Sequence, residues 1–351
     1  MNFSTNYTFY PDNKALEKAI EHYKSLMSDE QFSNNTGEES GGIADSVRAD
    51  NSSTVVDNFI YTRGNYEQHR YSANVFSEAR DVFGALLTDD LREKSPADWA
   101  EVHNSLGNIL AAIAQSVQDG DLYKLSIASF DHALEVYSQQ QSPMQWAASK
   151  ANVGTALQAL GRQEVDSKLM SKAIDAYTEA LLVYTRKETP EEWSVVMLQL
   201  GDTFHRYGSL LKGNRTFQKS VVAYKNALAE LDADLFALEL TAAHNNRGAV
   251  LHHLGESEQN ADRIEEAIRA YTTALTVSME QQLPFHLAVL IRVNKATANS
   301  VYAEFRKDAE LAEETADEFE LIIECFPHVL QPLCLKHCQA QLSKARAFSL
   351  N

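Results

Sequence analysis

The sequence is poor in cysteine, in basic residues and in long apolar runs, and each shortage excludes a class of protein. Only three of the 351 residues are cysteines, an odd number near one end that cannot make a disulfide framework. Lysine and arginine total 31 against 49 acidic residues, which gives a net charge of −18. Nucleic acids and anionic membranes attract basic surfaces, so neither is an expected partner. No segment approaches the roughly 18 uninterrupted apolar residues of a membrane span.

Motifs of catalysis and cofactor binding are also missing. The chain has no glycine-rich phosphate loop, no Gly-x-Ser-x-Gly and no His-Glu-x-x-His. We therefore expect a protein that is not an enzyme and that holds no cofactor and no metal. Residues 1–14 lack a basic segment followed by an apolar run, so no signal peptide is expected and a cytoplasmic location is the default.

What the chain does have is a period of 47 residues, shared by four kinds of residue. The repeated features are Pro96, Pro143 and Pro190, with Pro284 two periods later; Trp99, Trp146 and Trp193; Gly107, Gly154, Gly201 and Gly248; and the Ala-Leu pairs at 133–134, 180–181, 227–228 and 274–275. Self-similarity at a fixed period of this size predicts an array of similar supersecondary units that share a continuous core.

Each unit is expected to contain two helices. A hydroxyl residue followed by proline predicts the start of the first helix, as in Ser142-Pro143, because the hydroxyl caps the helix and proline suits its first position. Glycine is typical of the residue that follows a helix, which predicts helix ends at Gly161, Gly208 and Gly255. The second helix carries small residues and one ring per turn, and we expect the ring to fill the gap between neighbouring units.

The ends of the array are less regular than its centre. Leu321 and Ile322 keep the period, whereas Phe319 comes one position late. Residues 28–58 are rich in serine, asparagine, glycine and acid, which predicts a mobile loop. The expected organisation is a helical segment at 1–27, the acidic loop at 28–58, a degenerate leading repeat at 59–95, four repeats at 96–283, a degenerate fifth repeat at 284–326 and a capping helix at 327–351.

Over residues 79–322 these units resemble tetratricopeptide (TPR) repeats. The resemblance rests on Leu106-Gly107, Val153-Gly154 and Leu200-Gly201 in the first helices, and on Ala173, Tyr177 and Ala180 in a second helix. A repeat of that family has about 34 residues, so units of 47 depart from it. The resemblance implies an all-α fold: an α-solenoid of tandem antiparallel helix pairs in a right-handed superhelix, with the first helices lining the concave face.

The resemblance also implies a groove that binds a protein or peptide. The residues of the first helices that lie off the apolar stripe are Asn104, Asn108, Thr155, Gln158, Asp202, His205, Arg206, Asn245, His252 and His253. Their amides, imidazoles and guanidinium suit hydrogen bonding to an extended backbone or a carboxylate terminus. The alternative is that they are ordinary solvated helix residues, with Arg206 paired locally to Asp202.

Three other clusters suggest chemistry less strongly. Histidines at 205, 244, 252 and 253 complete no ligand motif for a metal. Cys334 and Cys338 share one face of the last helix with His337 beside them and Cys325 upstream, and a packed face is the preferred interpretation. Residues 59–71 interleave tyrosines with bases, as in nucleotide stacking, but packing is favoured because the rest of the chain is acidic.

The sequence therefore predicts a non-enzymatic scaffold that binds a protein or peptide partner in a concave groove. Two alternatives stay open. The protein could self-associate through its end helices or the acidic 304–324 segment, which would make a homo-oligomer. It could also be an enzyme or a small-ligand sensor with a pocket between residues 1–75 and the repeats.

Overall fold

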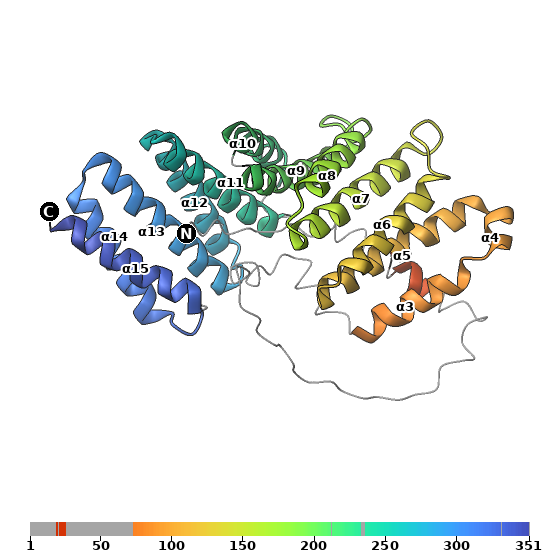
Figure 1. Cartoon of the computed structure of the whole chain (residues 1–351), viewed down its shortest axis with the longest axis horizontal. Helices are drawn as coiled ribbons and strands as arrows, with labels where there is room; N and C mark the ends of the chain where they lie inside the picture. Colours follow the sequence, from red (N-terminus) through yellow and green to blue (C-terminus); the bar gives the residue numbers. More distant parts are fainter. Residues whose placement is uncertain are drawn as a thin grey trace.

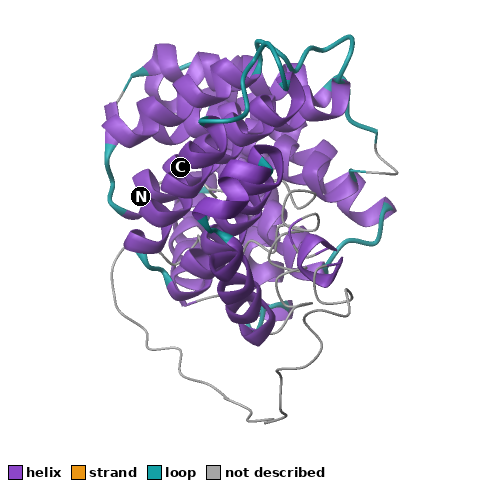
Figure 2. Cartoon of the chain, turned by 90° about the vertical axis from the view of Figure 1, so that its right-hand side faces the viewer, coloured by secondary structure: helices purple, strands orange, loops and turns teal. Residues whose placement is uncertain are grey.

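The computed structural model describes residues 19, 21–25, 73–211, 213–232, 236–330 and 332–350. Every regular element in these ranges is a helix (Figure 2). The acidic loop expected at 28–58 and the aromatic and basic segment at 59–71 lie outside the described residues.

Five helix pairs follow one another within the described ranges. They are α5 (Pro96–Val117) with α6 (Gly120–Leu134), α7 (Pro143–Gln163) with α8 (Ser167–Ala180), α9 (Pro190–Leu211) with α10 (Asn214–Leu228), α11 (Ala237–Glu258) with α12 (Ala261–Glu280), and α13 (Phe285–Arg306) with α14 (Ala309–Cys325). Helices α3 (Ala73–Leu86) and α4 (Asp89–Lys94) precede the pairs, and α15 (Pro332–Ser349) follows them.

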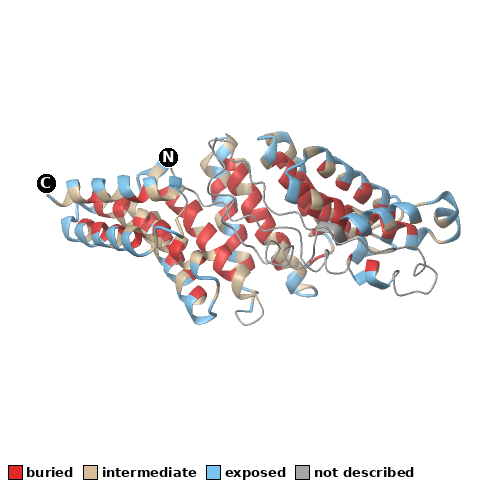
Figure 3. Ribbon diagram, turned by 90° about the horizontal axis from the view of Figure 1, so that it is seen from below, coloured by how far each residue is buried: buried red, intermediate tan, exposed pale blue. Residues whose placement is uncertain are grey.

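These helices form one curved row from α3 to α15 (Figure 1). From α4 to α15 each helix packs against the next, and buried residues run along the whole row (Figure 3). The first helices α5, α7, α9, α11 and α13 also touch one another, whereas the second helices make no comparable contacts with each other. The first helices therefore line the concave side, and the predicted all-α solenoid of tandem helix pairs is confirmed.

The prolines mark helix starts as expected, but the hydroxyls before them do not cap. Pro96, Pro143 and Pro190 are the first residues of α5, α7 and α9. Ser142 stands at the N-cap of α7 without a capping hydrogen bond from its side chain. Its hydroxyl instead accepts from the Ser138 amide at 3.1 Å. The Thr189 hydroxyl, before α9, likewise accepts from the Thr185 amide at 2.9 Å. These hydroxyls hold the turn before the helix.

Gly161, Gly208 and Gly255 do not end helices, so that prediction is wrong. All three lie inside α7, α9 and α11, and no described glycine has a positive φ. Helices α5, α11 and α13 end instead at residues other than glycine in the left-handed region, for example Gln259 at φ 51°. The glycines are needed for close approach, because a Cβ atom on Gly255 would lie 2.5 Å from Ile264 Cδ1.

The ring of each second helix lies directly on a glycine of its own pair. A Cβ atom on these glycines would lie between 2.5 and 2.9 Å from ring carbons, in the pairs Gly107 with Phe130, Gly154 with Tyr177, Gly201 with Tyr224 and Gly248 with Tyr271. All four rings are fully buried or nearly so. The ring also joins the core shared with the next unit, since Phe130 clusters with Ala147. It therefore packs within its pair as well as between units.

The first described helical residues pack on α3. Ala19 and Tyr23 belong to the same apolar cluster as Phe83 of α3, and the Tyr23 hydroxyl donates to Glu78 Oε2 at 3.0 Å. Helix α3 ends before Thr88, whose hydroxyl starts the separate helix α4 by accepting from the Leu91 amide.

The fifth pair runs one residue out of step with the others. Helix α12 begins at Ala261 and α14 at Ala309, a step of 48 residues, so that Phe319 takes the buried ring position. Glu318, which keeps the 47-residue step from Tyr271, accepts from Arg292 Nε at 2.8 Å instead. The late ring in the sequence is thus a shift in register, and the ring itself is kept.

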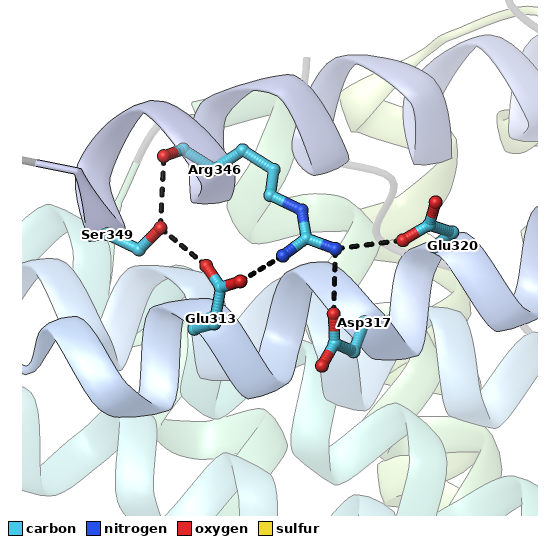
Figure 4. Close-up of polar contacts among 5 residues, drawn as sticks. All are labelled: Glu313, Asp317, Glu320, Arg346 and Ser349. Carbon is cyan, nitrogen blue, oxygen red and sulfur yellow. Dashed lines mark hydrogen bonds and ion pairs between the residues drawn. The ribbon is translucent and has the colours of Figure 1, made fainter.

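Helix α15 covers part of the acidic helix α14. Its Arg346 pairs with three carboxylates of α14, those of Glu313, Asp317 and Glu320, and the Ser349 hydroxyl donates to Glu313 at 2.7 Å (Figure 4). The acidic segment proposed for self-association is therefore partly neutralised within the chain.

The contact between ring and glycine predicts opposite effects for two glycine substitutions. Gly154→Ala should destabilise the protein by about 1–3 kcal/mol, because a Cβ there would lie 2.8 Å from the Tyr177 ring. Gly84→Ala is the matched control: no atom outside its own helix lies within 4 Å of its Cβ position, so it should stabilise α3 by at most about 1 kcal/mol. Chemical denaturation measures both. Equal effects would show that the ring does not need the glycine.

Candidate functional site

A cavity of about 360 Å³ opens on the concave face, across three consecutive first helices. Its polar lining includes Glu101, Asn104 and Ser105 of α5, Asn152 and Thr155 of α7, and Glu192 and Gln199 of α9. Tyr137 and Tyr184, which follow α6 and α8, also line it, and Ala19 closes part of one side. Three repeats and the N-terminal helical residues therefore build a single site.

Some of the residues that line the cavity recur with the 47-residue period of the sequence. Ser105, Asn152 and Gln199 are each 47 residues apart and occupy equivalent positions on α5, α7 and α9. Asn152 and Gln199 are buried, so they form the floor of the cavity. A row of hydrogen-bonding side chains thus crosses the groove, one from each unit.

The charge of the cavity is negative. Its described lining contains the carboxylates of Glu101 and Glu192 and no lysine, arginine or histidine. Within the described ranges neither carboxylate forms an ion pair or a side-chain hydrogen bond. Burial raises the pKa of Tyr137 to about 12, with the negative charges of Glu101 and Asp98 adding to the effect. The cavity therefore favours a neutral or positively charged group.

Asn104 is held in place by the neighbouring unit. Its side-chain oxygen accepts from the Ser149 hydroxyl at 3.2 Å and from Asn152 Nδ2 at 3.3 Å, both on α7. Its backbone carbonyl accepts from Asn108 Nδ2 at 3.1 Å. The amide therefore ties α5 to α7 at the edge of the cavity.

Most of the groove residues expected from the sequence are buried. Only Asn104 and His253 are partly exposed; the buried members are Asn108, Thr155, Gln158, Asp202, His205, Arg206, Asn245 and His252. Asn104 and Thr155 line the cavity and the others do not. The expected exposure is wrong for the eight buried residues, because each first helix packs on its pair mate, on the preceding second helix and on neighbouring first helices.

Four of these buried residues form a polar network with Tyr177 across three helices. Asp202 Oδ2 accepts from Gln158 Nε2 at 2.6 Å and from Arg206 Nε at 3.0 Å. The Tyr177 hydroxyl lies 3.0 Å from both Gln158 Oε1 and Thr155 Oγ1. Burial raises the Tyr177 pKa, so the hydroxyl stays protonated. Arg206 thus pairs locally with Asp202, the alternative that the sequence left open.

Two of the predicted histidines, His205 and His253, lie beside the buried ring of Phe217. His205 and His253 lie 5.9 and 4.5 Å from the Phe217 ring, measured between centroids. Burial lowers the pKa of His205 to about 3 and that of His252 to about 4, so both are neutral at pH 7. Asn245 accepts from Asn294 Nδ2 at 2.9 Å and links α11 to α13. These side chains serve packing between units.

The described residues offer no cluster of three or more histidine, cysteine or acidic side chains that could hold a metal. The three thiols are free: Cys338 is buried, Cys334 is half-buried and Cys325 is exposed. The hydrogen bond with Cys338 lowers the pKa of the Cys334 thiol and raises that of Cys338. Across the described helices, none has the length and apolar character that crossing a membrane requires.

The ordered helix pairs, the glycine and ring contacts and the first helices on the concave face define a TPR-like α-solenoid. Neither a family model nor a curated protein matches the chain. Among solved structures, the chain is similar to the C-terminal part of a TPR repeat-containing protein from Cytophaga hutchinsonii, at 12% identity and a TM-score of 0.34. That match covers 78% of this chain and 97% of the other.

The buried pair predicts that Arg206 is needed for stability. Arg206 is 7% exposed and Asp202 is not exposed, so Arg206→Ala leaves a buried carboxylate without its cation. We expect a loss of about 3 kcal/mol in the free energy of unfolding, measured by chemical denaturation. Arg215→Ala, which truncates an exposed arginine of α10, is the control and should change stability little. Wild-type stability in Arg206→Ala would assign Arg206 to the surface.

The buried histidines predict that stability falls as the pH is lowered below neutrality. The unfolded chain takes up protons near pH 6.5, whereas folded His205 and His252 resist protonation down to about pH 3 and about pH 4. Between these values the unfolded state binds more protons, so each unit of acidification weakens the fold. His205→Gln introduces the residue that stands at the equivalent position of the preceding repeat, Gln158. This variant should lose less stability than the wild type between pH 7 and pH 5. His328→Gln, at an exposed position, should keep the wild-type slope.

Proposed function

We propose that this protein is a non-enzymatic adaptor whose concave cavity, between α5, α7 and α9, binds a segment of a partner protein. The observation that carries the proposal is that equivalent side chains of three consecutive repeats, Ser105, Asn152 and Gln199, converge on one cavity. An extended peptide crossing the first helices meets one hydrogen-bonding side chain per unit, which suits recognition of peptide backbone.

The partner segment is expected to carry a basic or amide-rich group. Glu101 and Glu192 supply two carboxylates to the cavity without a cation from its described lining. Glu101 is exposed at the rim and Glu192 is half-buried, so an incoming lysine or arginine meets them at the entrance. Charge complementarity of this kind supports specificity and fast association. A basic group replaces the carboxylate terminus that the predicted groove residues suggested, because the charge of Arg206 is engaged by Asp202.

We further propose a cytoplasmic setting with no nucleic-acid partner. The three free thiols support a reducing compartment, and the net charge of −18 opposes binding to phosphate backbones. Self-association through the end helices stays an alternative, with α14 already partly covered by Arg346 of α15.

A second candidate function is the binding of a small molecule, as a sensor or an enzyme. One observation favours it: Ala19 lines the cavity, so the N-terminal helical residues form part of the wall. A volume of about 360 Å³ also falls within the range of small-molecule sites, roughly 300–1,000 Å³.

A pair of tryptophan substitutions tests the site. Ala148→Trp places a large ring in the cavity, whereas Ala128→Trp adds the same ring at an exposed position of α6, away from the lining. Peptides selected from a random library on the wild-type protein are expected to be basic and to lose at least about tenfold in affinity on Ala148→Trp, measured by calorimetry. Ala128→Trp should bind as the wild type does.

Two further results separate the candidates. Glu101→Gln with Glu192→Gln should weaken basic peptides more than neutral ones, because only the former lose an ion pair. A small molecule retained in the native mass spectrum of the wild type, and absent from Ala148→Trp, would favour the second candidate. Equal peptide affinity in both tryptophan variants would exclude the cavity as the binding site.

A further inference from the structure

A second cavity, of about 370 Å³, lies away from the concave face. It forms where the second helices α10 and α12 flank the first helix α11 (Figure 1). Its charged and imidazole lining comes from Lys225 of α10, His244 and Arg247 of α11, and Glu266 and Arg269 of α12. Three cations therefore face one carboxylate, in a protein whose net charge is −18.

Arg247 is the centre of this basic cavity (Lys225, His244, Arg247, Glu266 and Arg269). Within the described part of the chain its side chain forms no hydrogen bond and no ion pair, and its Nε is buried without a partner. His244 Nδ1 is buried and unpartnered as well. The carboxylates nearby have cations other than Arg247 as partners: Glu265 accepts from Arg269, another residue of the cavity, at 2.5 Å, and Glu266 lies 3.7 Å from Arg263. Arg247 as a whole is half-buried, but a buried guanidinium nitrogen without an acceptor is costly, which indicates that an acceptor binds there.

The preceding repeat shows that the fold does not need these charges. At the positions 47 residues earlier, Arg247 corresponds to Leu200, His244 to Met197, Arg269 to Val222 and Lys225 to Thr178. The same junction is thus built there without charge at any of the four positions.

In other repeats, a cation at the equivalent junction is paired with a carboxylate. Lys150, two periods before His244, lies 2.6 Å from Glu179. In the fifth pair, Arg292 donates to Glu318 at 2.8 Å. The junction around α11 gathers three cations, and Arg247 there has the charge of Glu266 nearby but forms no ion pair or hydrogen bond within the described residues.

We infer that the basic cavity is a binding site for a phosphate group. The guanidinium of Arg247 offers two parallel donors to two phosphate oxygens, and Lys225 and Arg269 add charge around them. The lining carries three positive charges against one negative, and Glu265 beside it offsets part of the charge of Arg269; the site stays net positive, as a phosphate monoester of about −1.5 to −2 at pH 7 requires. The cavity volume leaves room for the group to which the phosphate is attached. This site is independent of the concave cavity and of the function proposed for it.

The test titrates the full chain with inorganic phosphate, phosphoserine and a phosphoserine peptide, at constant ionic strength set with chloride. We expect saturable binding by calorimetry below about 10 mM for all three. Arg247→Leu, which restores the residue of the preceding repeat, should weaken binding at least about tenfold. The control is Arg215→Leu, an exposed arginine on the same helix as Lys225, which should bind as the wild type does.

The relative affinities show which kind of phosphate compound the cavity binds. A peptide that binds more tightly than phosphoserine identifies a phosphorylated partner as the source of the phosphate; equal affinities identify a small phosphate ester. Should Arg247→Leu fail to fold, Lys225→Thr and Arg269→Val take its place, because both residues occur at equivalent positions. The inference is overturned if no phosphate compound saturates, or if the folded variants bind as the wild type does.

Discussion

The contact between a glycine of the first helix and a ring of the second is the constraint on which the array depends. In four consecutive pairs the ring lies where a Cβ atom would otherwise stand, at 2.5–2.9 Å. In these four pairs a side chain at that position would meet the ring and push the two helices apart. The spacing within a pair then sets where the next first helix packs, and so sets the curvature that creates the concave cavity.

That contact also explains which parts of the structure were predictable from the sequence. The fixed spacing of Gly154, Tyr177 and their counterparts reflects a steric requirement in these units, so the succession of tandem helix pairs followed from it. The glycines at 161, 208 and 255 were misassigned because glycine serves two purposes. It allows a positive φ at a helix end, and it allows close approach within a helix. Sequence alone does not separate these two uses of glycine. In α11 the helix ends at Gln259, which has the left-handed conformation, and Gly255 lies inside the helix.

The candidate site was less predictable for a related reason. A helical stripe tells which residues are apolar, but it does not tell how many sides of the helix are covered. The first helices are covered on three sides, so polar residues such as Asp202 and Gln158 became partners of one another inside the array. Asn104 and Thr155, which line the cavity, were among the predicted residues, whereas Asn152 and Gln199 were missed although they keep the 47-residue step. Equivalent polar positions on consecutive first helices were the available signal.

The polar bonds between consecutive first helices have a mechanical consequence. Asn104 ties α5 to α7, Gln158 and Asp202 tie α7 to α9, and Asn245 and Asn294 tie α11 to α13. Apolar surfaces tolerate sliding, whereas a buried hydrogen bond is lost once its atoms move about an ångström out of line. These bonds therefore oppose shear between the units that they join, so that equivalent side chains along the concave face keep their order and spacing.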